Sequence, residues 1–179
     1  SKIFDAPIRA MRELIAGGRL GRVIQVDTWL FNDWLQRPRL AEELDERAGG
    51  GLVMRQGPHL FDIACYLAGG RARSLRAVAG RWDPHFDCAG NFTALLDFDS
   101  GVSASISING YGYFDSAELT WNIDGMGATG PDPRSRLKRP RRTGPLPPDR
   151  KYAEAAKPGA TPSTVAGDKQ PFFGLTIVS

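Results

Sequence analysis

The chain has 179 residues, of which 41% are hydrophobic and 24% charged, a composition typical of a globular protein with one ordinary core. No apolar run approaches the roughly 20 residues that span a bilayer, and two cysteines are too few for a disulfide scaffold, so we expect a cytoplasmic protein outside the membrane. The net charge of +3 is unevenly placed, because residues 130–151 carry eight basic and two acidic side chains and leave −3 for the remainder.

The first part of the chain predicts helices around one strand. Residues 4–17 have an apolar stripe at helical spacing and end at a Gly-Gly pair, which indicates a helix. Residues 21–31 are β-branched and roughly alternating, which indicates a strand, and residues 39–47 predict a short helix. Three glycines then precede an apolar run, and Pro58 predicts the first turn of a helix that ends near Gly69.

The later part of the chain predicts strands: 72–82, 91–98, 102–112, 117–124 and 172–179. Short turns between them favour antiparallel pairing. Helices that come early and strands that come late predict an α+β fold, an open and mostly antiparallel sheet with helices on one face. Because the segments 92–96 and 102–106 have apolar residues on both faces, we expect a second copy of the chain to cover the other face.

Residues 127–171 differ from the rest, because proline, glycine and charge dominate and no apolar period persists. We expect a long loop here, mobile or ordered by another subunit, inserted into a domain formed by residues 1–126 and 172–179.

Three sequence motifs that resemble functional sites are better explained as features without a binding or catalytic role. Gly-x-Gly-x-x-Gly at 125–130 matches the dinucleotide fingerprint, but prolines and basic residues follow where a helix must open. The basic run 134–142 has no interleaved aromatic residue for stacking on bases, so we expect a solvated loop and no nucleic-acid partner. The two histidines and two cysteines match no standard metal-binding spacing: His59, Cys65, His85 and Cys88.

His59 is a candidate proton acceptor. In the first turn of the predicted helix, the positive end of the helix dipole lowers the pKa of a histidine, and a neutral imidazole accepts a proton near pH 7. A structural histidine, hydrogen-bonded in a half-buried turn, fits the same residues equally well.

The stretch GGGLVMRQGPHLFDIACYLAGG (49–70) resembles the Gly-Gly-Gly…Gly-x-His…Asp signature in the C-terminal domain of Gfo/Idh/MocA oxidoreductases. RELIAGGRLGRVIQV (12–26) resembles the helix–Gly–strand element that precedes it. NDWLQRPRLAEELDERAGGG, RQGPH and RSLRAVAGRWDP are similar to the branch of 4,5-dihydroxyphthalate (phthalate cis-dihydrodiol) dehydrogenases. The resemblance covers residues 3–126 well and 172–179 weakly.

The resemblance implies a dihydrodipicolinate-reductase-like C-terminal domain, whose open sheet makes subunit contacts on the face away from the helices. It also implies an N-terminal Rossmann domain that binds NAD or NADP. No such domain is found in this sequence, so we interpret the chain as a fragment, the substrate-binding and oligomerisation domain of a dehydrogenase. By itself we expect it to be inactive and to bind neither cofactor nor metal.

The family pattern places an aspartate four residues before the catalytic histidine, which corresponds to His59. This chain has Arg55 there, and a guanidinium does not act as a base but binds a carboxylate through two hydrogen bonds. We therefore expect a carboxylated cyclic cis-diol as substrate, with Asp62 orienting the imidazole. The other expected substrate-binding residues are Gln56, Arg37, Arg39 and Trp34. A core position for Trp34 and solvated Arg37 and Arg39 are the alternative.

Two other functions remain open. The first is a sugar or inositol dehydrogenase of the same family, and the second is a non-catalytic binding or assembly domain that keeps only the fold. His59 favours an enzyme, whereas Arg55 in place of the aspartate favours the non-catalytic domain.

Overall fold

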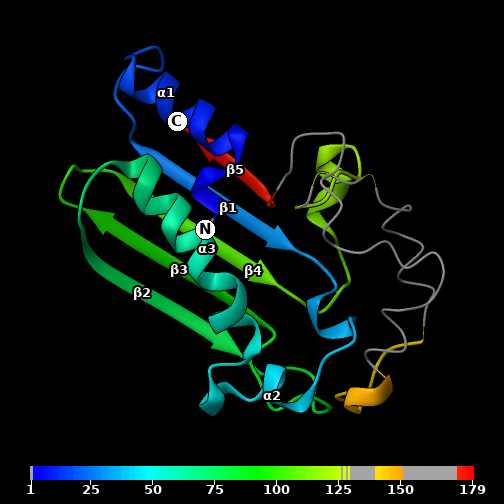
Figure 1. Cartoon of the computed structure of the whole chain (residues 1–179). Helices are drawn as coiled ribbons and strands as arrows, with labels where there is room; N and C mark the ends of the chain where they lie inside the picture. Colours follow the sequence, from blue (N-terminus) through cyan, green and yellow to red (C-terminus); the bar gives the residue numbers. More distant parts are fainter. Residues whose placement is uncertain (1, 126, 128, 130–139, 151–172) are drawn as a thin grey trace.

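The computed structural model describes residues 2–125, 127, 129, 140–150 and 173–179, which form an open five-stranded sheet with helices on one face (Figure 1). The α-helices are α1 (Ala6–Ala16), α2 (Ala41–Leu44) and α3 (Gly51–Ala68). The strands are β1 (Gln25–Phe31), β2 (Ala72–Gly80), β3 (Asn91–Phe98), β4 (Ser103–Asn109) and β5 (Leu175–Val178). Short 3-10 helices are η1 (Lys2–Phe4), η2 (Trp34–Gln36), η3 (Glu46–Ala48) and η4 (Ser116–Thr120). The predicted α+β fold is confirmed.

The strand order is β2-β3-β4-β1-β5, and the pairs are antiparallel except for β4 with β1. Hairpins join β2 to β3 and β3 to β4, and the second hairpin turns at Gly101, whose φ is +81°. β1 lies parallel to β4 because the intervening chain crosses over the sheet through α3. None of the helices in the described part is long and apolar enough to cross a membrane.

The core lies between α3 and the sheet. Five side chains of α3 are completely buried: Leu52, Leu60, Ile63, Ala64 and Leu67. They pack against alternate residues of the strands, such as Val26, Phe92 and Ile106. Strand 91–98 is confirmed at both ends, and its buried residues alternate with exposed ones as the pleat requires.

The predicted start of α3 at Pro58 is wrong, because the helix begins seven residues earlier, at Gly51. Pro58 is therefore an interior residue, and its missing N–H leaves the carbonyl of Met54 without its helical partner. At the N-cap position, Gly50 packs so closely on the preceding segment that a Cβ would lie 2.6 Å from the carbonyl oxygen of Glu42. This close packing and the burial of Leu52 hold the first turns despite the proline.

The strand predicted for residues 117–124 is also wrong, because this segment contains η4. The Asp115 carboxylate accepts a hydrogen bond of 2.9 Å from a backbone N–H of the first turn. Trp121 and Asn122 then adopt left-handed φ values of 53° and 60° and end the helical turn. Asp115 followed by Glu118 is a helix-start pattern that outweighs the strand propensity of the later residues.

The sheet face away from the helices is mixed in character, and the expectation that segment 102–106 is apolar on both faces is wrong. β4 contributes only serines to this face at its centre, and Ser105 donates a hydrogen bond to Asp27 of β1. Apolar side chains come from the other strands, where Leu95 is 59% and Trp29 40% exposed.

Residues 140–150 are held against the body of the same chain. The Arg141 guanidinium donates a 2.7 Å hydrogen bond to the carbonyl of Tyr111 and lies 4.3 Å from the ring centre of Tyr113. The backbone N–H of Leu146 donates to the carbonyl of Arg39 at 2.7 Å. These eleven residues thus need no other subunit for their contacts, whereas most of the loop expected at 127–171 lies outside the described residues.

Candidate functional site

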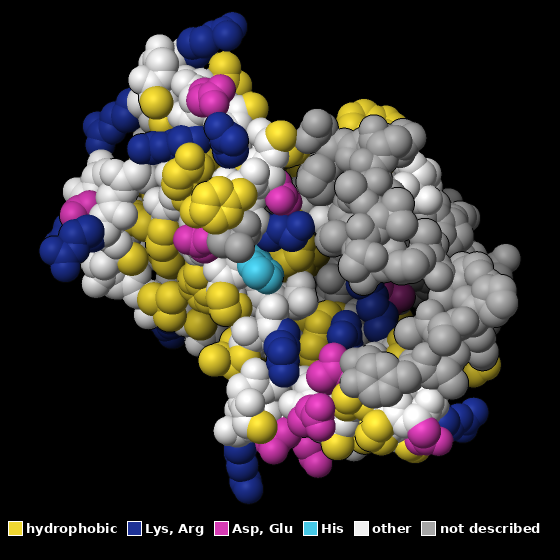
Figure 2. Space-filling model, in the orientation of Figure 1, with side chains coloured by type: hydrophobic (Ala, Val, Ile, Leu, Met, Phe, Trp, Pro, Cys, Tyr) yellow, Lys and Arg dark blue, Asp and Glu magenta, His cyan; other side chains and the backbone are white. Residues whose placement is uncertain are grey.

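One face of α3 carries the residues that the sequence singles out. Arg55, His59 and Asp62 are separated by four and three residues, so their side chains emerge on one side of the helix. Arg55 is exposed, and its guanidinium makes no hydrogen bond or ion pair with any described residue. Gln56 beside it is half-buried. On the helix side, Figure 2 shows a histidine with basic, acidic and hydrophobic side chains in the area around it.

His59 is the ninth residue of α3, so the expectation that a helix N-terminus lowers its pKa is wrong, because the dipole acts only over the first turn. The pKa of His59 is nevertheless lowered. The largest cause is burial, which removes water from the charged imidazole, and the positive charges of the amino terminus and of Lys2 add to it. The carboxylates of Asp62 and Asp5 oppose the shift. The imidazole is therefore kept neutral by burial.

Two residues from opposite ends of the described chain complete the surroundings of His59. The ring of Phe173 lies 5.3 Å from the imidazole centre, and the Nζ of Lys2 lies 5.4 Å from the Phe173 ring centre. Lys2 is held by an ion pair with Asp5 at 3.2 Å and by a 2.7 Å hydrogen bond to the carbonyl of Gly125. Neither Lys2 nor Phe173 carries a sequence signal, because only the folded sheet brings the two ends of the chain together.

Asp62 acts on His59 through its charge, which favours the protonated imidazole. Although both residues belong to the described part of α3, no hydrogen bond joins the carboxylate to the imidazole. Asp62 is half-buried and lies one turn further along the helix.

The segment after β1 does not present Trp34 to a ligand, because its side chain is only 3% exposed and belongs to the core. The Arg39 guanidinium covers the indole at 4.3 Å, donates to the Trp34 carbonyl at 3.2 Å and reaches Glu43 at 3.5 Å. Burial lowers the pKa of Arg39. Arg37 is about half exposed and is paired with Asp33 at 2.6 Å. Both arginines have structural partners, and among the described residues neither of them pairs with α3.

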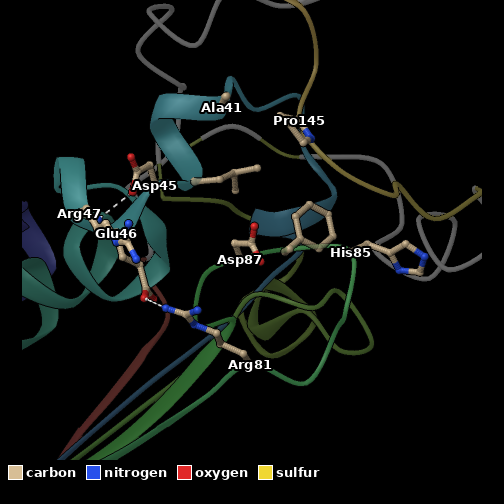
Figure 3. A pocket seen from close by; sticks show the side chains of 10 residues that line it. Ala41, Asp45, Glu46, Arg47, Arg81, His85, Asp87 and Pro145 are labelled. Atoms are coloured by element: carbon tan, nitrogen blue, oxygen red, sulfur yellow. Dashed lines mark hydrogen bonds and ion pairs between the residues drawn. The ribbon is translucent and has the colours of Figure 1, made fainter.

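A separate cavity of about 540 Å³ lies between α2, η3 and the loop after β2 (Figure 3). Glu46 lines this cavity. It pairs with Arg81 at 2.5 Å and accepts a 2.7 Å hydrogen bond from the N–H of Ala89. That backbone hydrogen bond is the main reason why the pKa of Glu46 is lowered. His85 is paired with Asp83 at 2.8 Å. The contacts of Glu46 tie the loop to η3. None of the residues expected to bind substrate lines this cavity.

The glycine motif at 125–130 lacks the structural setting of a dinucleotide site. A fingerprint loop joins a strand to a helix, whereas here the preceding element is the 3-10 turn η4. The described residues of this motif therefore do not fit a nicotinamide dinucleotide. Among the described residues, no group of histidine, cysteine and acidic side chains is arranged to hold a metal ion.

We predict that protonation of His59 destabilises the chain. Because the folded pKa lies below the ordinary value of 6.5, protons bind the unfolded chain more readily. The contribution of neutral His59 is complete above pH 6.5 and is lost as the pH falls through the folded pKa. Urea unfolding at pH 7.5 and at pH 5.5 gives the free energy of unfolding under each condition. The decrease in this free energy from pH 7.5 to pH 5.5 should be smaller for His59→Gln than for the wild type. An equal acid loss in both proteins would contradict this prediction.

Comparison with known proteins gives consistent matches. The family model of the GFO/IDH/MocA C-terminal domain matches residues 8–129. A 1-carboxy-3-chloro-3,4-dihydroxycyclohexa-1,5-diene dehydrogenase from Comamonas testosteroni is 39% identical over 134 residues. The solved structure of a protein from Bordetella bronchiseptica RB50, assigned as a dehydrogenase, has 31% identity and a TM-score of 0.80 over 99% of this chain. A Sinorhizobium meliloti 1021 protein, assigned as a myo-inositol dehydrogenase, has 26% identity and a TM-score of 0.51 over 64% of this chain.

These relatives are all much longer than the chain. The match covers 75% of this chain but 34% of the Comamonas protein. It covers 46% of the Bordetella chain and 35% of the Sinorhizobium chain.

Proposed function

The chain belongs to the GFO/IDH/MocA C-terminal domain family, and from this we propose that it is the substrate-binding domain of a longer NAD(P)-dependent dehydrogenase that oxidises a carboxylated cyclic cis-diol. The observation that carries the proposal is the placement of Arg55, which has no partner among the described residues, and a neutral His59 one turn apart on the same face of α3. The name of the Comamonas relative, a carboxylated dihydroxycyclohexadiene dehydrogenase, supports the substrate class.

Oxidation of an alcohol removes a hydride from carbon and a proton from the hydroxyl group. The nicotinamide, held outside this chain, supplies the hydride acceptor. The neutral imidazole of His59 takes the hydroxyl proton, and the nearby Asp62 carboxylate stabilises the imidazolium that results. The Arg55 guanidinium donates two parallel hydrogen bonds to the substrate carboxylate and so fixes the diol against His59.

The test is Arg55→Ala in the complete enzyme, with a carboxylated cis-diol and the same diol without its carboxylate as substrates. Loss of a hydrogen bond to a charged group costs about 1.5–3 kcal/mol, so we expect KM for the carboxylated diol to rise roughly 10- to 100-fold, with a small change in kcat. Formation of reduced nicotinamide measures the rate. Arg9→Ala, an exposed arginine of α1, is the matched control.

Equal effects of Arg55→Ala on both diols would reject the carboxylate assignment. A sugar or inositol dehydrogenase would then be favoured, as the likeness to the Sinorhizobium protein supports. A complete protein that oxidises neither diols nor sugars would favour a non-catalytic binding or assembly domain.

We also propose that the chain forms homo-oligomers through the sheet face away from the helices. Trp29, Leu95 and Ile177 expose apolar surface there, and a second copy would cover it. Light scattering of the wild type should give the mass of at least a dimer. The double variant Trp29→Lys, Leu95→Lys should give the mass of a monomer. Leu20→Lys, an exposed residue outside the sheet, is the control. A monomeric wild type at high concentration would contradict the proposal.

A further inference from the structure

The imidazole of His59 packs against the aromatic ring of Phe173. The ring centres are 5.3 Å apart and the ring planes meet at 84°, an edge-to-face contact. Neither ring nitrogen of His59 forms a hydrogen bond with a described residue, and the Asp62 carboxylate acts on the imidazole only through its charge. The edge-to-face contact with Phe173 therefore limits the rotation of the imidazole.

Phe173 is held in place by the sheet. The next residue, Gly174, has a φ of +76°, and a Cβ there would lie 2.2 Å from the carbonyl oxygen of Trp29. The backbone thus turns tightly against β1, and Leu175 pairs with Trp29 in the first step of β5. The Phe173 ring also packs against the hydrophobic core. Its position is set by strand pairing.

From this geometry we infer that Phe173 is a positioning residue, whose ring sets the orientation and the hydration of the His59 imidazole. For its consequence in catalysis the inference rests on the proposed function, whereas the contact itself is independent of it. A proton acceptor must lie within hydrogen-bond reach of the hydroxyl group. A displacement of about 1 Å is enough to lower a rate substantially.

The ring also contributes to the burial that lowers the pKa of His59. Four charged groups act on the imidazole as well: the amino terminus of the chain, Lys2 and Asp5 near it, and Asp62 from α3 itself. Arg55 lies one turn before it on the same face. A substitution at Phe173 removes none of these charges, although Lys2 loses the ring over which its Nζ lies. Its main effects are therefore on the water around the imidazole and on the freedom of the imidazole side chain.

The test follows His59 directly by NMR, since the 179-residue chain has only two histidines and His85 serves as an internal reference. We expect Phe173→Ala to remove the ring-current displacement of the His59 imidazole protons and to move the titration midpoint upward. Phe173→Tyr should retain both features. Phe114→Ala, which removes another edge-to-face contact, with Phe31, is the matched control and should leave His59 unchanged. Unchanged His59 signals in Phe173→Ala would overturn the inference.

A second measurement uses the complete enzyme and separates this inference from the proposed function. Phe173→Ala should lower kcat roughly 10-fold or more, shift the acid limb of its pH profile upward, and leave KM nearly constant, and Phe173→Tyr should restore the rate. If the NMR signals respond as expected but His59→Ala leaves the rate unchanged, the contact stands and the proposed role of His59 fails.

Discussion

If the proposed role of His59 is right, we expect replacing His59 with alanine in the complete enzyme to lower kcat by roughly 10²- to 10⁴-fold, the usual loss when a general base is removed. KM changes little, because Arg55 and not His59 holds the ground-state carboxylate in the proposed complex. Steady-state kinetics with a carboxylated cis-diol and NAD or NADP measures the change. We expect the wild-type rate to fall in acid as His59 becomes protonated, and this acid limb to be absent from the residual rate of His59→Ala.

The control for His59→Ala is His85→Ala, which removes the exposed histidine beside Asp83. It should leave both kcat and the shape of the pH profile unchanged. If His59→Ala retained most of the wild-type rate, His59 would be a structural residue, and the non-catalytic interpretation of the domain would gain support.

Gly174→Ala has the largest expected effect on stability. Its φ of +76° disfavours any side chain, and the added Cβ would lie 2.2 Å from the backbone oxygen of Trp29, which cannot move without breaking the β1–β5 pairing. We expect the free energy of unfolding to fall by about 3 kcal/mol. Urea denaturation measures this change, and hydrogen exchange of the β1 amides should show loss of β5.

Gly18→Ala is the matched control for Gly174→Ala. Its φ of +68° is similar, but no atom lies within 4 Å of the added Cβ, so only the backbone strain remains. That strain costs about 1–2 kcal/mol. Equal destabilisation by the two substitutions would show that the contact with Trp29 contributes nothing.

Local patterns in the sequence predict the sheet better than the start of the main helix. Strand β3 was predictable at both ends because each of its buried residues alternates with an exposed one. The end of α3 was predictable because Gly69 adopts a left-handed φ that ends a helix. Its start was not, because a proline usually marks the first turn, whereas here the packing of Gly50 and Leu52 extends the helix past Pro58.

The candidate site was predictable only where its residues are neighbours in sequence. Arg55 and His59 share a face through their spacing alone, which holds whether the helix begins at Gly51 or at Pro58. Trp34 was expected in the site but lies in the core. The sequence did not distinguish the two, because a tryptophan near an arginine occurs both in cores and in binding loops. Lys2 and Phe173 could not be predicted, because their contact depends on the pairing of β1 with β5.

The position of β1 between β4 and β5 determines the order in which the chain is able to fold. Its partners are far away in sequence, since Val26 pairs with Ala104 on one side and with Val178 on the other. During synthesis β1 leaves the ribosome long before either partner, while β2, β3 and β4 assemble through local hairpins. Until the last residues of β5 arrive, the backbone of β1 remains an open edge beside the exposed Trp29, where another nascent chain is able to pair with it. The four residues of β5 therefore cover the edge of β1 at which another chain could otherwise pair, as well as complete the sheet.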